Sequence, residues 1–516
     1  MMEATTANED EALPAGPRGP ARRGRSRWRA VVCLIAIGLA GCTLGPDYKR
    51  PDVPLPQAWR AEPADAADLA NTDWWKAFND AALDALIDAA LDANKDLKLA
   101  TFNVAAFDAR LQVSRSAIYP QIGYNVVAER RRFSEEQPTG GGGLQAGVGP
   151  IVNNFALGAI LNWEVDLWGR VQRSNEAALA DLMASEDTRR GVMLTVVSSV
   201  AASYVELLAL DKELAIARKA LANRREALAL METKYRGGSG TRLAVEQARA
   251  AVEETLAEIP PIETSIARTE GALNLLLGRN PGPIARRSLD ALELPRMPQG
   301  VPADVLTRRP DVMAAEQNLI AANARIGVAK TAYFPTLSLA AALGLASDDL
   351  RWLFAETART GIAGAVLGGP IFTGGRIEGE IRQAEANQQQ MSVRFEQAVQ
   401  VALQEVEDAL VTRAKSGERE DAMGRRVGAL READKLARVR YEGGQSNFME
   451  VLEAEFATYG AENLQTQSRR DTSLALITIY KAMGGGWMVE QDKRRAPVTP
   501  GTEVQAQAAG VTGTQR

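Results

Sequence analysis

The sequence of 516 residues contains no histidine and only two cysteines. We expect Cys33 to be removed with an N-terminal leader and Cys42 to carry a modification, as argued below. The common metal sites use His and Cys, and the Ser-His and Cys-His nucleophile arrangements need a histidine. These sites and any disulfide framework are therefore excluded. We expect no catalytic residue, no metal site and no cofactor.

The chain also lacks an excess of basic charge. Its 60 Lys and Arg are outnumbered by 65 Asp and Glu, which gives a net charge of −5. Residues 1–41 carry six arginines against four acidic residues, so the remainder sits near −7 (−5 − 2). This balance argues against a nucleic-acid partner. A carboxylate-dependent hydrolase survives these exclusions, but no spacing of carboxylates suggests one.

Residues 1–41 have the features of a signal peptide. An arginine-rich segment precedes the apolar run Ala30–Ala40, which is too short to span a bilayer but typical of a signal-peptide core. The run ends with small residues before Cys42, which predicts that this cysteine is lipid-modified and becomes the new N-terminus. Thr43 follows where an aspartate would favour the inner membrane, so the outer membrane is the expected address. The alternatives are a secreted protein with an incidental cysteine and an N-terminal membrane helix.

The chain contains an internal repeat. Tyr235–Arg249 reads Y-R-G-G-S-G-T-R-L-A-V-E-Q-A-R, and Tyr441–Glu455 reads Y-E-G-G-Q-S-N-F-M-E-V-L-E-A-E, at an offset of 206 residues (441 − 235). Each copy predicts a helix end, a glycine turn and a new helix capped by Thr241 in one copy and by Ser446 or Asn447 in the other. The repeat therefore predicts one elongated body made of two halves. Chance recurrence of a Tyr-x-Gly-Gly turn is the alternative.

Each half contains two segments with the period of a β-strand. We expect strands at about 120–133, 153–165, 336–346 and 361–372. Phe155–Val165 alternates apolar and small or polar residues over about eleven positions, the length of a tilted transmembrane strand. A half-buried soluble sheet is the alternative. Four strands cannot close a barrel and an open edge is not tolerated in lipid, so several chains must share one barrel.

A heptad repeat follows the strands. Apolar or aromatic residues recur every seven positions at Met193, Val200, Leu207, Leu214, Leu221, Leu228 and Tyr235. Such a repeat predicts a supercoiled helix, and the span from about Leu167 to Tyr235 would be roughly 100 Å long. We expect the returning helix to be interrupted at Pro260-Pro261.

The predicted organisation follows from these patterns. Residues 1–41 are the leader and 42–75 an extended, lipid-anchored arm. The two repeats cover 76–302 and 303–485, with hairpin tips at 235–241 and 441–448. Residues 486–516 are predicted to be a disordered tail. The fold class is mainly α with a small transmembrane β part, in the order helix, helix, strand, strand, long helix, helix, written twice.

Four motifs carry a resemblance to a known family. They are C-T-L-G-P-D-Y at Cys42–Tyr48, R-R-P-D-V at Arg308–Val312, A-Y-F-P at Ala332–Pro335 and the two Tyr-x-Gly-Gly tips. Over about Cys42–Met483 the chain resembles the TolC-like outer-membrane factors, or outer-membrane efflux proteins, and in particular their lipoprotein branch.

The resemblance implies a homotrimer with a shared twelve-stranded outer-membrane barrel and a long periplasmic α-helical tunnel. It also implies that the tips dock to a periplasmic adaptor and, through it, to an inner-membrane pump, expected to be of the RND type. The candidate docking residues are Tyr235, Gly237, Gly238, Gly240, Tyr441, Gly443, Gly444 and Ser446.

A difference between the halves suggests a gate. Leu228 and Asp434 each lie seven residues before a tip tyrosine. In a trimer, Asp434 could form a ring of three carboxylates at the periplasmic entrance, with Arg438 nearby. The alternative is a solvated Asp434 paired with Lys435 or Arg438.

The expected function is a passive exit duct for drugs or small molecules, and not an enzyme. The same duct serving a type I protein-secretion system is one alternative. A lipid-anchored coiled-coil scaffold without a pore is another, from a different class.

Overall fold

The computed structural model describes residues 43–56, 59, 72–132, 151–295, 305–485 and 487–494. The leader, Cys42 and the segment 133–150 lie outside these residues. The prediction that Cys42 is lipid-modified therefore stays a prediction.

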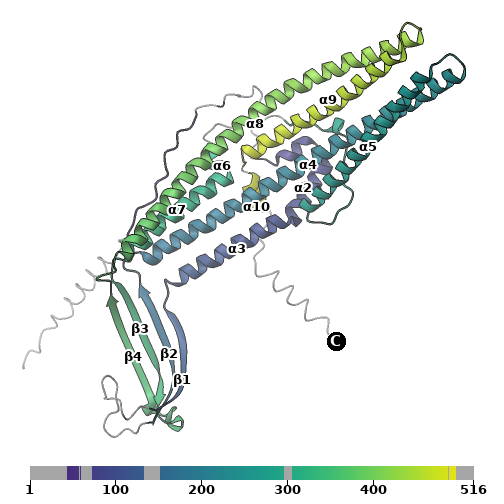
Figure 1. Cartoon of the computed structure of the whole chain (residues 1–516). Helices are drawn as coiled ribbons and strands as arrows, with labels where there is room; N and C mark the ends of the chain where they lie inside the picture. Colours follow the sequence, from purple (N-terminus) through teal and green to yellow (C-terminus); the bar gives the residue numbers. More distant parts are fainter. Residues whose placement is uncertain are drawn as a thin grey trace, which may run out of the picture.

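The protein is elongated, with a four-stranded sheet at one end and two helical hairpin tips at the other (Figure 1). The first half contains α2 (Ala81–Ala93), α3 (Lys95–Ser116), β1 (Gln121–Arg132), β2 (Ile151–Val165), α4 (Arg170–Arg236) and α5 (Arg242–Leu276). The second contains α6 (Val305–Arg308), α7 (Pro310–Thr331), β3 (Thr336–Ser347), β4 (Arg359–Gly368), α8 (Arg376–Glu442) and α9 (Phe448–Ala482). Short 3₁₀ turns include η1 (Trp74–Phe78), and α10 (Trp487–Arg494) follows the second half. This is the predicted order, written twice.

The two halves match in length element by element. Helices α3 and α7 both have 22 residues, and strands β1 and β3 both have 12. These pairs are offset by 215 residues (310 − 95). Helices α4 and α8 both have 67 residues and α5 and α9 both have 35, at an offset of 206 (376 − 170). At 1.5 Å per residue the long helices extend about 100 Å, as the heptads predicted.

The sheet is antiparallel throughout and has the order β1-β2-β3-β4. Strands β2 and β3 join the two halves, from Phe155 opposite Ser347 to Val165 opposite Leu337. One face is mostly apolar, because the alternating large side chains fall on the same side. Its members include Ile122, Tyr124, Val126, Phe155, Leu157, Leu161, Trp163, Leu337, Leu339, Leu343, Leu345 and Leu367. Among the described residues, β1 and β4 each pair with one strand only.

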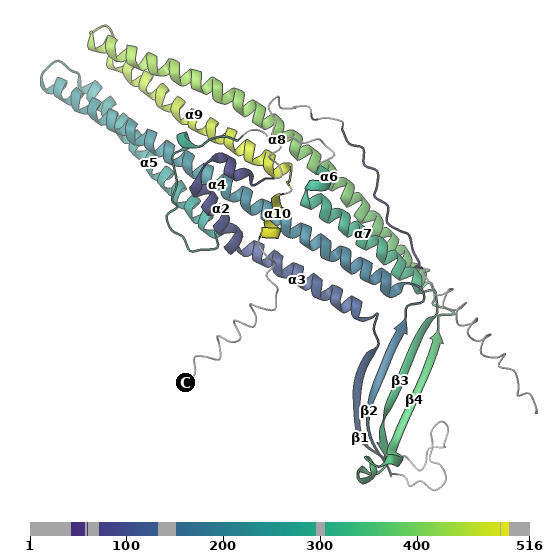
Figure 2. The ribbon, with the colours of Figure 1, turned by 180° about the vertical axis from the view of Figure 1, so that it is seen from behind.

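The helices continue the order of the strands. Helix α3 packs on α4, α4 on α7 and α7 on α8, while α5 pairs with α4 and α9 with α8 (Figure 2). The largest hydrophobic core lies where α2, α4 and the 3₁₀ turn η1 meet. Trp74 stacks on Tyr480 with ring centroids 4.9 Å apart, which ties the start of the first half to the end of the second.

The predicted break at Pro260-Pro261 is wrong, because α5 runs through both prolines without interruption. Each proline removes one N–H donor. Both prolines are exposed, so the carbonyls left without a partner can reach water.

The prediction that residues 486–516 are disordered is wrong for the first part of that segment. Helix α10 begins at Trp487, which is fully buried, and its ring meets that of Trp75 edge-on with centroids 5.0 Å apart. Gln491 Nε2 donates to Asp73 Oδ1 at 2.9 Å. Burial of Trp487 and Met488 thus overrides the polar composition that follows them.

The last strand also differs from its prediction. It was expected to reach Phe372 but ends at Gly368. Gly368 is opposite Thr336, the first residue of β3, so β3 offers no further partner. Gly369 and Pro370 follow, and both disfavour a strand that is not held on either side.

Candidate functional site

The N-terminal arm begins at the junction between the strands and the helices. Thr43 lies against Gly169, where a Cβ would be 2.9 Å from the Thr43 methyl carbon, and Leu44 N donates to Trp168 O at 3.2 Å. Gly45 has φ 102° and packs on Gly327, and a Cβ on Gly45 would approach the Gly327 Cα to 2.5 Å. The residue that follows Cys42 in the sequence is therefore fixed beside the sheet.

The arm then follows one side of α7 towards α8. Glu316 accepts from Tyr48 Oη at 3.0 Å and from Arg50 Nε at 2.6 Å, while Asn323 Nδ2 donates to Pro46 O at 2.8 Å. Residues two positions apart on a helix point about 200° apart. The opposite side of α7, which includes Asn318 and Arg325, is therefore not covered by the arm.

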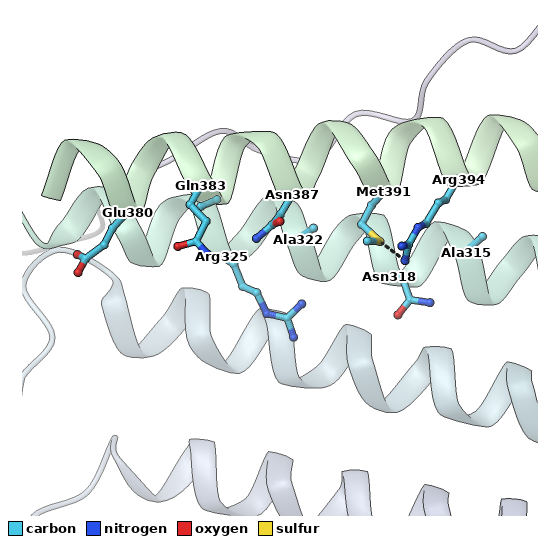
Figure 3. Close-up of a pocket in the computed structure, with 10 residues that line it drawn as sticks. Ala315, Asn318, Ala322, Arg325, Glu380, Gln383, Asn387, Met391 and Arg394 are labelled. Atoms are coloured by element: carbon cyan, nitrogen blue, oxygen red, sulfur yellow. Dashed lines mark hydrogen bonds between the residues drawn. The ribbon is translucent and has the colours of Figure 1, made fainter. Parts of the chain in front are cut away.

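That uncovered side lines a hollow of about 660 Å³ between α7 and α8 (Figure 3). Its lining mixes alanines and Met391 with polar side chains, which include Asn318, Gln383 and Asn387 between Arg325 and Arg394. Arg325 also reaches from α7 to pair with Asp181 of α4. The described residues contain no cluster of potential metal ligands.

The two tips are glycine turns with the predicted caps. Gly238 and Gly444 have φ of 79° and 71°, which glycine adopts at little cost. Thr241 Oγ1 accepts from Ala244 N at 3.2 Å, and Asn447 Oδ1 accepts from Glu450 N at 3.1 Å. Asn447 rather than Ser446 is therefore the cap of the second tip.

The tip tyrosines differ in their surroundings. Tyr235 is 48 % exposed, whereas Tyr441 is half-buried against the other hairpin. Lys234 Nζ donates to Tyr441 Oη at 3.1 Å and lies 4.4 Å from the ring centroid. Tyr441 Oη in turn donates to Met231 Sδ at 3.4 Å. The second tip is thus held to the first, while Tyr235 stays accessible.

Asp434 and Arg438 lie together near the second tip. Arg438 Nε donates to Asp434 Oδ1 at 3.2 Å, and the guanidinium also binds the half-buried Glu455 of α9. Lys435 pairs with Glu432 instead. Burial raises the pKa of Glu455, and the charge of Arg438 opposes that rise. Within one chain the Asp434–Arg438 pair is present, and the ring of three carboxylates stays a prediction.

Sequence reasoning missed a second link between the hairpins. Tyr459 of α9 donates to Glu258 Oε2 of α5 at 2.5 Å, and Arg224 lies 5.6 Å from the Tyr459 ring centroid. Arg224 is buried and donates to Ala251 O at 3.0 Å. It occupies a position in the apolar heptad lane of Ala217 and Met231. A charged residue in an apolar lane was the signal that could have found it.

An elongated chain that ends in an apolar-faced sheet and two helical tips has the architecture of an outer-membrane channel subunit. A model of the outer membrane efflux protein family matches residues 86–279 and 301–485, one match in each half. The chain therefore belongs to the outer membrane efflux protein family.

Known relatives support the same assignment. The cation efflux system protein CusC of Escherichia coli is 33 % identical over 462 residues, covering 88 % of this chain and 97 % of CusC. The toluene efflux pump outer membrane protein TtgF of Pseudomonas putida is 32 % identical over 466 residues, covering 88 % and 96 %. The open-state MtrE channel of Neisseria gonorrhoeae has a TM-score of 0.78 at 29 % identity, covering 86 % of this chain and 99 % of that one. The protein is an outer-membrane component of an efflux system.

Proposed function

We propose that the protein is a passive exit duct for small molecules and that three copies form it. The observation that carries this proposal is the pair of unpaired sheet edges on a mostly apolar sheet. Among the described residues, β1 and β4 have no outer neighbour, and open edges are not tolerated in lipid. Three copies of four strands would give a closed twelve-stranded barrel, above the minimum of about eight.

The anchor is proposed to be a lipid on Cys42. Thr43 and Leu44 lie against Gly169 and Trp168, at the point where β2 passes into α4. A lipid on the preceding residue would therefore start close to the end of the apolar sheet. A Cys42→Ala variant should still assemble but lose the lipid, as mass spectrometry of the mature protein would reveal.

The tips are proposed to dock to a periplasmic adaptor that connects to an inner-membrane pump of the RND type. Exposed apolar side chains support this role, because Leu243 and Met449 begin the returning helices next to the turns. The unequal exposure of Tyr235 and Tyr441 suggests that the two hairpins contact the adaptor differently.

The gate is proposed to lie at Asp434 and Arg438. Three chains around one axis would bring three such pairs together beneath the tips. Asp434→Ala should then raise single-channel conductance and weaken block by cations. Unchanged conductance and unchanged block would leave Asp434 as a surface charge paired with Arg438.

The substrate class can be tested in a strain that lacks this protein. CusC and TtgF are named for cations and toluene, so a panel of metal cations, toluene and lipophilic dyes covers both chemistries. Restored resistance and reduced dye accumulation on re-expression would support small-molecule efflux. Loss of a secreted protein from the medium, with unchanged resistance, would instead favour type I secretion. Wild-type resistance and secretion without the protein would favour a scaffold.

A further inference from the structure

The end of the sheet that is distant from the helices carries positive charge on its apolar face. Strands β1 and β3 run from the helices to this end, and β2 and β4 return from it (Figure 1). In an outer-membrane channel with a periplasmic helical tunnel, this is the extracellular end. The apolar face lies against lipid and the other face lines the pore.

Strand β1 changes from apolar to basic along the lipid face. Alternate residues of a strand share a face, so the apolar series from Ile122 to Ala128 continues directly into Arg130 and Arg132. Both arginines are exposed. A charge on the lipid face is costly at the middle of the bilayer but tolerated near its surface. The two arginines therefore mark the level of the outer headgroups.

The arginine between them has different surroundings. Arg131 lies on the pore face and pairs with Glu129 on that face, with Nη2 2.6 Å from Oε1. Among the described residues, Arg130 and Arg132 have no acidic partner. Charge on the pore face of β1 is thus balanced within the strand, whereas charge on the lipid face is not.

Two other strands add polar groups to the same face. Asn153 of β2 is directly opposite Arg130, which places their Cβ atoms about 5 Å apart. Arg359 begins β4 and is opposite Leu345, so it also lies on the apolar face. It pairs with Glu356 at 3.3 Å, but both side chains are largely exposed, and such a pair is weak and easily exchanged.

The two edges of the sheet meet in the proposed barrel, where β4 of one copy lies beside β1 of the next. We propose that Arg130, Arg132 and Asn153 of one copy, with Arg359 of the neighbouring copy, bind the phosphate groups of lipid A, the phosphorylated glycolipid of the outer leaflet. This site rests on the proposed barrel, because only its closure brings Arg359 to the other three residues. Arginine is suited to the role, since its guanidinium binds phosphate through two parallel hydrogen bonds.

Continuity with the apolar face favours a lipid over a soluble anion. Tyr124 and Val126 are exposed on the same side of β1, nearer the helices, where the acyl chains of a lipid held by the arginines would lie. The connection between β3 and β4 adds the exposed side chains of Leu350, Trp352 and Phe354 at the same end of the sheet. Aromatic side chains of this kind are enriched at membrane–water interfaces.

Binding of purified lipid A to the full-length, lipidated protein in detergent tests the site. Native mass spectrometry counts the bound lipid and gives its affinity. Dephosphorylated lipid A and inorganic phosphate probe the two parts of the ligand separately. We expect one lipid A for each copy in the assembly, much weaker binding of the dephosphorylated lipid, and no displacement by inorganic phosphate at the same concentration.

The chain offers a matched control for the two arginines. Arg130→Gln combined with Arg132→Gln should weaken lipid A binding about 30-fold, since each arginine near an anionic lipid contributes a factor of about five. Arg359→Gln should weaken it about fivefold. Arg131→Gln removes the adjacent arginine from the opposite face and should leave the affinity unchanged. Arg130→Lys with Arg132→Lys keeps the charge and should retain most of the binding.

Three results would overturn the site. They are unchanged binding in the double Gln variant, an equal loss in Arg131→Gln, and equal binding of dephosphorylated lipid A. Displacement by an equal concentration of inorganic phosphate would overturn the choice of a lipid as the ligand. Unchanged binding in Arg359→Gln would overturn the sharing of the site between copies.

Assembly and conductance are measured on the same preparations. Variants that do not migrate as the wild-type oligomer in native gels are excluded as misfolded. An oligomer that binds lipid A as expected but has neither conductance nor an efflux phenotype would leave the lipid site standing and remove the proposed duct. A conducting oligomer whose lipid A binding is the same in the double Gln variant would leave the duct standing and overturn the site.

Discussion

The long helices α4 and α8 have the same length and equivalent places in the two halves, yet they are buried very differently. Twenty-five residues of α4 are buried and only nine of α8. Helix α4 lies between α3 and α7, whereas α8 has α7 on one side and no fourth helix beyond it among the described residues. The difference in burial between α4 and α8 therefore depends on how many neighbouring helices each one has in the single chain, and not on the equivalent places that the two helices occupy in the repeat. The exposed surface of α8 is the kind expected where a neighbouring copy would pack in the proposed trimer.

Helix α10 contributes to this difference, because it packs on α4 of the first half, and the described residues of the first half form no helix that corresponds to it. Trp487→Ala should lower the free energy of unfolding by about 3–5 kcal/mol, since a fully buried tryptophan is replaced by a cavity. Denaturant unfolding followed by tryptophan fluorescence would measure it.

Val489→Ala is the matched control on the same helix, because Val489 is exposed. It should change stability by less than about 0.5 kcal/mol. Equal effects of the two variants would show that α10 does not pack as described.

A matched pair of valines compares the long helices directly. Val205 of α4 is fully buried, and Val411, its counterpart at the 206-residue offset, is 43 % exposed. Val205→Ala should cost roughly 2 kcal/mol, and Val411→Ala less than half of that. Thermal unfolding of both variants checks this expectation. Equal losses would mean that a neighbouring copy buries Val411 as deeply as the core buries Val205.

The strands, the heptads and the tips were predictable because each is encoded over a short stretch. Alternation in Phe155–Val165 and seven-residue spacing in α4 are local patterns. The end of β4, the continuity at Pro260 and the burial of Trp487 were not predictable in this way. Each depends on surroundings that the local sequence does not show. These are the point at which β3 begins, the exposure of α5 to solvent, and the packing of Trp487 on Trp75.

The candidate site shows the same division. The sequence identified Tyr235 and Tyr441 as equivalents and Asp434 as a departure from the repeat. It did not indicate that Lys234 binds Tyr441, because that contact joins two residues 207 apart in sequence, one on each hairpin. Nor did it indicate that Arg438 binds Glu455 across the second hairpin.

The tip tyrosines provide the next comparison. Tyr441→Ala removes the cation–π contact and the hydrogen bond to Lys234, together worth about 1–2 kcal/mol, or a factor of about 5–30 in the equilibrium between closed and open tips. We expect a larger open probability in single-channel recordings. Tyr235→Ala should leave it unchanged and affect adaptor binding instead. Identical recordings for the two variants would contradict the asymmetry of the tips.

The smallest expected effect concerns Glu455. Its pKa is raised in the folded protein, so its contribution to stability is present below its ordinary pKa and is lost as pH rises through the folded value. Glu455→Gln should therefore gain melting temperature relative to the wild type between pH 4.5 and 7. Because Arg438 is partly exposed, the corresponding gain in the free energy of unfolding should stay below about 1 kcal/mol. A difference that does not vary with pH would contradict burial as its cause.

Conductance of the purified protein in planar bilayers tests the central claim most directly. A gated exit duct predicts a small, mostly closed conductance that rises when a cognate periplasmic adaptor is added. A large constitutive conductance would contradict the gate, and the absence of any conductance, with or without adaptor, would contradict the duct itself.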